Sequence, residues 1–316
     1  HQHLIPEGGS VWFKRDVAEN PEFRVEETLL AWLGRDGDLS RLQAVQIATE
    51  LGLEKALPMI RELALPQGQG TLSRAERGIV SQAANALVTF RDCETIPALL
   101  EAAKSASDAR VRLRLTQVVY QAVAGGQAPC KDTVPLEAVE EMVLAGLESA
   151  PEAKQGSLLI LAQRPEWAAS VSERLLAILD GEEGDNVYVR RGALSALAAA
   201  GDEAFGRRLP RYFHADNFNI RSQAVSASRR YARLPAFESF FESLWMGILR
   251  DETESSLAFD SALGGLRDTA GVIVGLPPAV MNDPKTRRER SITFRKELFE
   301  KGESFGLDRL AWNVGW

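Results

Sequence analysis

The amino-acid sequence predicts an all-α protein built as a stack of helical hairpins. A helix rich in small residues, with a basic residue near its start, recurs along most of the chain, and the helices between its copies have one apolar face. Units of about 30 to 40 residues, each made of two amphipathic helices, stack on their neighbours to share a continuous core. We expect about six to seven hairpins with atypical capping ends.

The first segment, residues 1–37, is expected to hold a leader and a capping helix. Residues 1–21 are irregular, whereas residues 22–33 combine apolar side chains with Trp32 in a helical pattern. End repeats of a stack need a different outer face, so we interpret this helix as a cap on the first repeat.

Residues 38–266 carry the repeats, and the clearest copy of the first helix is Val189–Leu197. Alignment on Arg190 places six residues at one position: Arg41, Val80, Arg112, Lys154, Arg190 and Arg221. Five of these six are basic, and the residue three places later is mostly small, which lets a neighbouring helix approach closely. A seventh, degenerate copy begins near Ser256.

The second helices are recognised by their apolar spacing. Residues 56–64 and 95–103 match each other and both carry Pro in the opening turn, where its missing N–H costs nothing. Apolar residues then follow at helical spacing, which indicates one buried face. Later second helices are predicted over residues 136–147, 171–179, 205–212 and 237–249.

Glycines lie between the two helices of several repeats. Gly52, Gly126 and Gly201 stand where a helix must end, and we expect each to adopt a positive φ. Acidic or polar residues such as Asp202 then open the second helix and complement its dipole.

The copies at Val189–Ala204 and Ala56–Ala64 resemble the HEAT-repeat family, and the resemblance covers residues 38–250. Armadillo and other α-solenoid families share much of this pattern. The resemblance implies a right-handed α-α superhelix whose second helices line the concave face. It also implies a scaffold or binding surface, since few members are enzymes. Val80 in place of Arg and the long loop over residues 125–135 depart from the pattern.

The last segment, residues 267–316, is less regular. Gly275–Pro278 breaks any helix, and a charged helix is predicted over residues 285–301. Trp312 and Trp316 are interpreted as a cap on the last repeat, with docking onto a partner as the alternative.

Composition sets limits on the class of protein. A hydrophobic fraction of 45% with 26% charged residues is typical of a soluble folded chain, and the net charge of -7 argues against wrapping of nucleic acid. No apolar run reaches the roughly 20 residues of a membrane span. The cytoplasm is favoured, with export or the periplasm as the alternative because the chain begins at His1 rather than Met.

Cys93 and Cys130 are the two cysteines of the chain. They are too few for a disulfide scaffold and lack metal-site spacing, so they are expected to stay reduced. A disulfide is the alternative and requires a local close approach, because packed helices lie about 8–10 Å apart whereas bridged Cα atoms lie within about 7 Å. A bridge would indicate an oxidising compartment.

Motifs for catalysis, cofactors and metals are missing from the sequence. There is no H-E-x-x-H, G-x-S-x-G, phosphate-binding loop or C-x-x-C, so no enzyme activity, cofactor or metal is expected. No His-Glu dipeptide occurs, which excludes the HEAT-like enzyme that holds iron with such pairs. The acidic stretch 180–186 does not match a calcium loop and is interpreted as a solvated loop.

Charge is the best remaining guide to a site. Residues 187–233 contain nine arginines against three carboxylates, a formal charge of +6 in a chain of net -7. Arg207 and Arg211 are four residues apart and share a helix face beside Arg208 and Tyr212. The candidate partner-binding residues are Arg207, Arg208, Arg211, Tyr212, His214 and Trp245. The alternative interpretation is a solvated face, with Trp245 and its neighbouring phenylalanines in the core.

Three functions fit these features. The first is a non-enzymatic scaffold that binds a protein partner, with an acidic or phosphorylated segment, in the concave groove. The second is nucleic-acid binding, or activity similar to the HEAT-like DNA glycosylases, through residues 187–233. The third is an enzyme similar to the HEAT-like lyases that attach bilins to phycobiliproteins, which would need a groove carboxylate that the sequence does not identify.

Overall fold

The computed structural model describes residues 24–34, 37–65, 72–181, 186–237, 240–250, 256–270 and 300. Every regular element in these residues is a helix, which confirms the all-α prediction. Among them, no helix has both the length and the apolar character needed to cross a membrane. The leader over residues 1–21, the predicted helix 285–301 apart from Glu300, and both C-terminal tryptophans lie outside the described residues.

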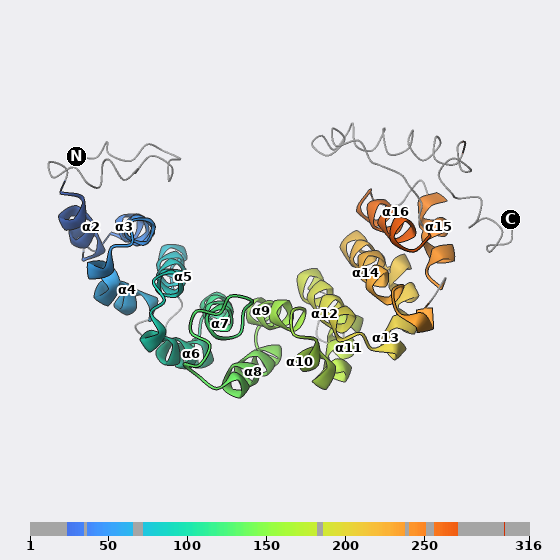
Figure 1. Cartoon of the computed structure of the whole chain (residues 1–316), viewed down its shortest axis with the longest axis horizontal. Coiled ribbons are helices and arrows are strands. Elements are labelled where there is room, and N and C mark those ends of the chain that lie inside the picture. The colour runs from blue at the N-terminus through green and yellow to red at the C-terminus, as the bar shows by residue number, and fades with distance from the viewer. Residues whose placement is uncertain are drawn as a thin grey trace. The chain divides into compact units, whose positions relative to one another are not determined.

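The chain divides into two compact units, residues 1–160 and 161–316, and each is described by itself. The α-helices of the first unit are α2 Val25–Leu33, α3 Asp38–Glu50, α4 Leu57–Ala64, α5 Arg74–Thr89, α6 Ile96–Ser105, α7 Ala109–Val123, α8 Leu136–Ala145 and α9 Pro151–Leu161, which reaches the boundary. Helices α3, α5 and α7 pack in succession and form one row, with α4, α6 and α8 in a second row (Figure 1).

The second unit repeats this arrangement. Its helices are α10 Pro165–Ser170, α11 Ser172–Asp180, α12 Val187–Ala200, α13 Glu203–Arg208, α14 Phe218–Tyr231, α15 Glu242–Arg250 and α16 Ser256–Ala270, with 3-10 turns η5 Leu209–His214 and η6 Pro235–Phe237. Helix α12 packs on α14 and α14 on α16, so α16 supplies the helix expected of the seventh copy. The predicted helix 237–249 is wrong at its start, because Phe237 closes η6 and α15 begins at Glu242.

The helices that pair as hairpins in the structure are shifted by one helix from the pairs that the sequence pattern predicts. Helix α4 packs closely on α5, α6 on α7 and α11 on α12, whereas α3 and α4 do not pack closely on each other. In these cases the hairpin runs from a second helix to the first helix that follows it. The fold still stacks amphipathic helices in two rows within each unit.

The helix boundaries in the structure place the recurring basic residue more consistently than the sequence alignment does. The fourth residue of six first helices is basic: Arg41, Arg77, Arg112, Lys154, Arg190 and Arg221. The assignment of Val80 to this position is therefore wrong. Helix α5 has 16 residues where α3 has 13, and its extra N-terminal turn brings Arg77 to the fourth position.

Four of these arginines bind a backbone carbonyl that precedes their own helix. The donor–acceptor distances are 2.9 Å for Arg77 to Leu72, 2.6 Å for Arg112 to Ala106, 2.8 Å for Arg190 to Leu179 and 2.7 Å for Arg221 to Ala215. Carbonyls at helix ends have no partner within the helix, and a charged donor satisfies them well. The basic residue of the repeat thus closes the turn between successive helices.

The glycine predictions hold at two of three turns. Gly52 and Gly201 have φ of 64° and 71°, which confirms the expected left-handed conformation. Gly126 does not adopt it, because α7 ends with the amides of Ala124 and Gly125 both donating to the Tyr120 carbonyl. After α5 a non-glycine residue, Arg91, takes the left-handed position with φ of 57°.

Cys93 and Cys130 form a disulfide, which corrects the prediction of two reduced thiols. Their Cα atoms lie 5.2 Å apart. The helix-to-helix distance used in the prediction does not apply, because Cys93 opens the 3-10 turn Cys93–Thr95 and Cys130 lies in the loop between α7 and α8. The bridge joins two loops rather than two helices.

An aromatic cluster fills the core of the second unit. Phe205, Tyr231, Phe237, Phe241 and Trp245 are all buried, and their rings contact one another in a chain with centroid distances of 5.3 to 6.2 Å. The buried Gly206 makes room for this cluster. A Cβ at Gly206 would lie 2.5 Å from the Phe237 ring and 2.6 Å from the Tyr231 ring.

We predict that Gly206→Ala lowers the free energy of unfolding by about 1–3 kcal/mol, since an added methyl group overpacks the aromatic cluster. Gly247→Ala in α15 is the matched control, because a Cβ there meets no atom within 4 Å. We expect the control to be neutral or more stable by about 0.5–1 kcal/mol, the helix preference of Ala over Gly. Urea denaturation measures both, and equal stability of Gly206→Ala and the wild type would contradict the prediction.

Candidate functional site

The segment predicted as a basic patch forms a surface at the end of α13 and along η5. We call it the α13–η5 surface, and it consists of the exposed side chains Arg207, Arg208, Arg211 and His214. Asp202 caps the start of α13, and its carboxylate accepts a hydrogen bond from the amide of Phe205 at 3.1 Å. The segment then tightens into the 3-10 turn near Pro210, so its basic side chains do not lie on one regular helix.

Arg211 and Tyr212 are tied to Asp180 at the end of α11. The Tyr212 hydroxyl donates to the Asp180 carboxylate at 2.6 Å, and the Arg211 guanidinium donates both to that carboxylate and to the Tyr212 hydroxyl. The guanidinium also lies over the Tyr212 ring, 4.7 Å from its centroid. These three side chains therefore join η5 to α11.

The environment of this triad shifts two pKa values. Burial opposes ionisation of Asp180, but hydrogen bonds from Tyr212 and Arg211 outweigh it and hold its pKa below the ordinary value. Burial, together with the hydrogen bond to Asp180, raises the pKa of Tyr212 to about 12. At neutral pH the site thus holds a carboxylate, a guanidinium and a neutral phenol.

The same separation of 31 residues joins Asp and Arg elsewhere in the fold. Arg61 binds Asp92 at 2.6 Å and Arg77 binds Asp108 at 3.2 Å, both between successive parts of the first unit. The pair formed by Asp180 and Arg211 has the same separation in reverse order. Asp180 was assigned to a solvated loop, and the recurrent separation is the signal that could have identified its role.

The other candidate residues differ in how much surface they present. The Arg207 guanidinium lies 5.6 Å from the centroid of the Phe237 ring, and the charge of Arg208 acts on Asp180. Trp245 has no exposed surface, and its indole N–H donates to Ser228 at 2.8 Å. Tyr212 is only 5% exposed. Arg207, Arg208, Arg211 and His214 are therefore the candidates that can touch a partner directly.

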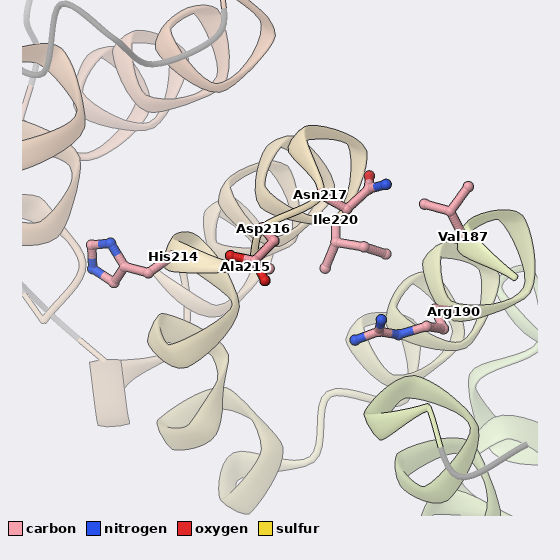
Figure 2. A pocket seen from close by; sticks show the side chains of 7 residues that line it. All are labelled: Val187, Arg190, His214, Ala215, Asp216, Asn217 and Ile220. Atoms are coloured by element: carbon pink, nitrogen blue, oxygen red, sulfur yellow. The ribbon is translucent and has the colours of Figure 1, made fainter. Parts of the chain in front are cut away.

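A pocket of about 330 Å³ lies next to this surface, between the start of α12 and the turn into α14 (Figure 2). Its lining consists of Val187, Arg190, His214, Ala215, Asp216, Asn217 and Ile220. Figure 2 shows the imidazole of His214 pointing away from Val187 and Arg190. The ring is thus not placed to act on a molecule held between these two side chains.

Two polar side chains of the pocket, Arg190 and Asn217, serve the fold. Arg190 donates to the Leu179 carbonyl at 2.8 Å, and the Asn217 side chain accepts the amide of Asn219 at 2.9 Å and so caps α14. Across the described part of the chain, no group of three or more His, Cys, Asp or Glu side chains could hold a metal ion.

A second basic group lies at the ends of α14 and α16, and sequence reasoning did not select it. We call it the α14–α16 arginine cluster. It comprises Arg229, Arg233 and Arg267 around the carboxylate of Asp268, together with the exposed Arg230 next to Arg229 on α14. The count of charges over residues 187–233 includes three of these arginines but ends before α16. The spacing of Arg229 and Arg233, four residues apart at a helix end, is the signal that could have found it.

Comparison with known proteins adds no family to these observations, since no protein-family model and no curated protein matches the chain.

We predict that Arg211→Ala lowers the free energy of unfolding by about 1 kcal/mol, because it leaves Asp180 and Tyr212 without their charged donor. Arg208→Ala, with an exposed side chain that makes no such hydrogen bonds, is the control and should change stability by less than about 0.5 kcal/mol. Thermal denaturation at neutral pH compares the two.

The contribution of Asp180 should also depend on pH. Its folded pKa is lowered, so the stabilisation is present above the ordinary pKa of about 3.9 and is lost as the pH falls through the folded value. We expect Asp180→Asn to be less stable at pH 7 and to lose less stability than the wild type on acidification. An identical loss of stability on acidification in both proteins would show that Asp180 does not form these stabilising hydrogen bonds.

Proposed function

We propose that this chain is a non-enzymatic, HEAT-like α-solenoid. It is a right-handed superhelix whose concave groove binds a protein partner carrying an acidic or phosphorylated segment. The observation that carries this proposal is the excess of exposed arginine on the second unit, next to a pocket in which Arg190 and the Asn217 side chain already form hydrogen bonds within the protein. Exposed cations suit recognition of an anionic surface.

The packing supports the solenoid part of the proposal. In each unit the first helices pack in succession, and small residues such as Ala44, Ala193 and Ala224 are fully buried where these helices meet. The basic fourth residue recurs from α3 to α14. Hairpins that contact only their neighbours produce long surfaces suited to binding another chain.

Nucleic acid is the second candidate, and the arginine content of residues 187–233 is the observation that favours it. Guanidinium groups bind phosphates and stack on bases. The net charge of -7 weighs against it, because non-specific binding to nucleic acid depends on phosphate neutralisation. A protein partner is therefore preferred.

We infer further that the chain folds in an oxidising compartment, outside the cytosol. The sequence favoured the cytoplasm, but Cys93 and Cys130 are bridged. Structural disulfides persist in exported proteins and are rare in the cytosol of most cells. The disulfide thus favours the alternative of an exported or periplasmic protein.

The partner can be trapped by a photo-crosslinking amino acid in place of Arg208. We expect one dominant protein adduct in extracts of the native host, and we expect Arg207→Glu combined with Arg211→Glu to reduce it at least tenfold. The control is Arg110→Glu with Arg114→Glu in α7, two exposed arginines with the same change of charge. The proposal fails if no protein adduct forms, or if both double variants reduce it equally.

The same protein should be tested with a labelled DNA duplex. Tight binding that falls steeply with added salt, together with the absence of a protein adduct, would replace the proposal by the nucleic-acid alternative.

We predict that Cys93→Ser and Cys130→Ser each lower the free energy of unfolding by about 2–4 kcal/mol, because the bridge closes a loop with a separation of 37 residues. The double variant should lose no more than either single variant, since one bond is broken in all three. Denaturation with and without a reducing agent measures this. A wild type that is equally stable in both conditions would contradict the structural role of the bridge and remove the argument for an oxidising compartment.

A further inference from the structure

We propose that the α14–α16 arginine cluster is the anchor of the interaction, a site that takes carboxylate groups from an acidic segment of the partner. This proposal rests on the proposed function and gives it a specific contact. The cluster includes none of the six residues selected from the sequence.

The geometry of the cluster is fixed by two contacts of Arg229. Its guanidinium donates to the Asp268 carboxylate at 2.6 Å. It also lies against the backbone of α16 at Gly264, where a Cβ would come within 2.9 Å of one of its nitrogens. The missing side chain at Gly264 therefore lets the guanidinium lie close to α16. A cation held in this way loses little conformational freedom when it binds an anion.

The positive charge around Asp268 exceeds the negative charge of its carboxylate. Arg229, Arg233 and Arg267 all lie within 3.5 Å of its carboxylate oxygens. Three guanidinium groups therefore face one carboxylate. Arg230 is exposed on the same last turn of α14. Its charge lowers the pKa of the buried Tyr231, whereas the charge of Asp202 raises it. A further anion would relieve the repulsion among these cations.

The cluster also presents donors to solvent. The side chains of Arg233 and Arg267 are 71% and 59% exposed. Each guanidinium has five N–H donors, and a single carboxylate uses at most two from each side chain. Arg233 and Arg267 therefore keep N–H groups that can form paired hydrogen bonds with a carboxylate from outside.

The α13–η5 surface is a weaker anchor on the same criteria. Arg211 is held by Asp180, and the charge of Arg208 also acts on that carboxylate. Arg207 lies over the ring of Phe237, and Phe237 follows Arg233 by four residues in the sequence. We assign the α13–η5 surface a supporting role, with the main electrostatic contact at the cluster.

The partner's chemistry follows from the charge of the whole chain. With a net charge of -7, the rest of the surface repels an acidic segment, so a local excess of arginine directs it to one place. The exposed setting fits side chains on a polypeptide. The planar fork of arginine pairs with both oxygens of a carboxylate, which favours Glu and Asp side chains.

The probe is a fluorescein-labelled hexaglutamate peptide, with hexaglutamine as the uncharged control, and the readout is fluorescence anisotropy at low salt. We expect Arg230→Gln, Arg233→Gln and Arg267→Gln together to weaken binding at least tenfold. The matched control is Arg191→Gln, Arg207→Gln and Arg208→Gln, which removes the same charge from exposed arginines and should weaken binding less than threefold.

Three outcomes would overturn the assignment: unchanged affinity of the cluster variant, equal loss in the control variant, or no binding of hexaglutamate by the wild type. Arg233→Gln alone, at the most exposed of these arginines, covers the case in which the triple variant unfolds, and it should weaken binding about threefold. Inorganic phosphate is added as a competitor. Displacement of the peptide by phosphate at equal charge concentration would show that the site binds free anions and not a segment.

These results separate the two proposals. If the Arg208 crosslinker forms a protein adduct but the cluster variants bind hexaglutamate normally, the proposed function stands and the anchor is rejected. If the wild type forms no adduct and binds no hexaglutamate, both proposals are rejected.

Discussion

The hydrogen bond between a basic side chain at the fourth position of a first helix and a backbone carbonyl ahead of that helix is the constraint that orders both units. It occurs with arginine at α5, α7, α12 and α14, with distances from 2.6 to 2.9 Å. The bond satisfies a carbonyl that helix geometry leaves open and fixes the angle at which the chain enters the next helix. Small buried residues such as Ala193 and Ala224 can then face the neighbouring helix at close range. Packing of the rows depends on this entry angle.

The position of an arginine in its helix decides whether its charge is available to a partner. Near the start of a first helix, as at Arg112 and Arg221, the guanidinium turns towards a carbonyl of its own chain. Near a helix end, as at Arg233 and Arg267, it complements the helix dipole and stays exposed. The formal charge of +6 over residues 187–233 is therefore divided between two roles. A count along the sequence cannot separate them.

Local periodicity predicted the existence and type of the helices and most of the core, because the spacing of apolar residues in each amphipathic segment indicates which face is buried. Contacts between distant residues were harder to predict. The disulfide, the tie between Asp180 and Tyr212, and the pairing of second helices with the first helices that follow them all depend on how turns direct the chain. Tyr212 and Trp245 were selected for their residue type, and burial gives both a structural role. Arg207 and Arg208 were placed on the surface correctly, since helix-end arginines rarely bury their charge.

The aromatic cluster gives the basic surfaces of the second unit a rigid support. Phe237 contacts Tyr231 on one side and carries the Arg207 guanidinium on another, so α13, η6 and the end of α14 meet at one ring. Burial in this cluster raises the pKa of Tyr231 above its ordinary value, as it does for Tyr212. The same apolar surroundings strengthen electrostatic interactions at their edge, because less water screens them. Arginines that stand on such a core bind an anion with less loss of freedom than arginines on a flexible loop, which connects the packing of this unit to its capacity for recognition.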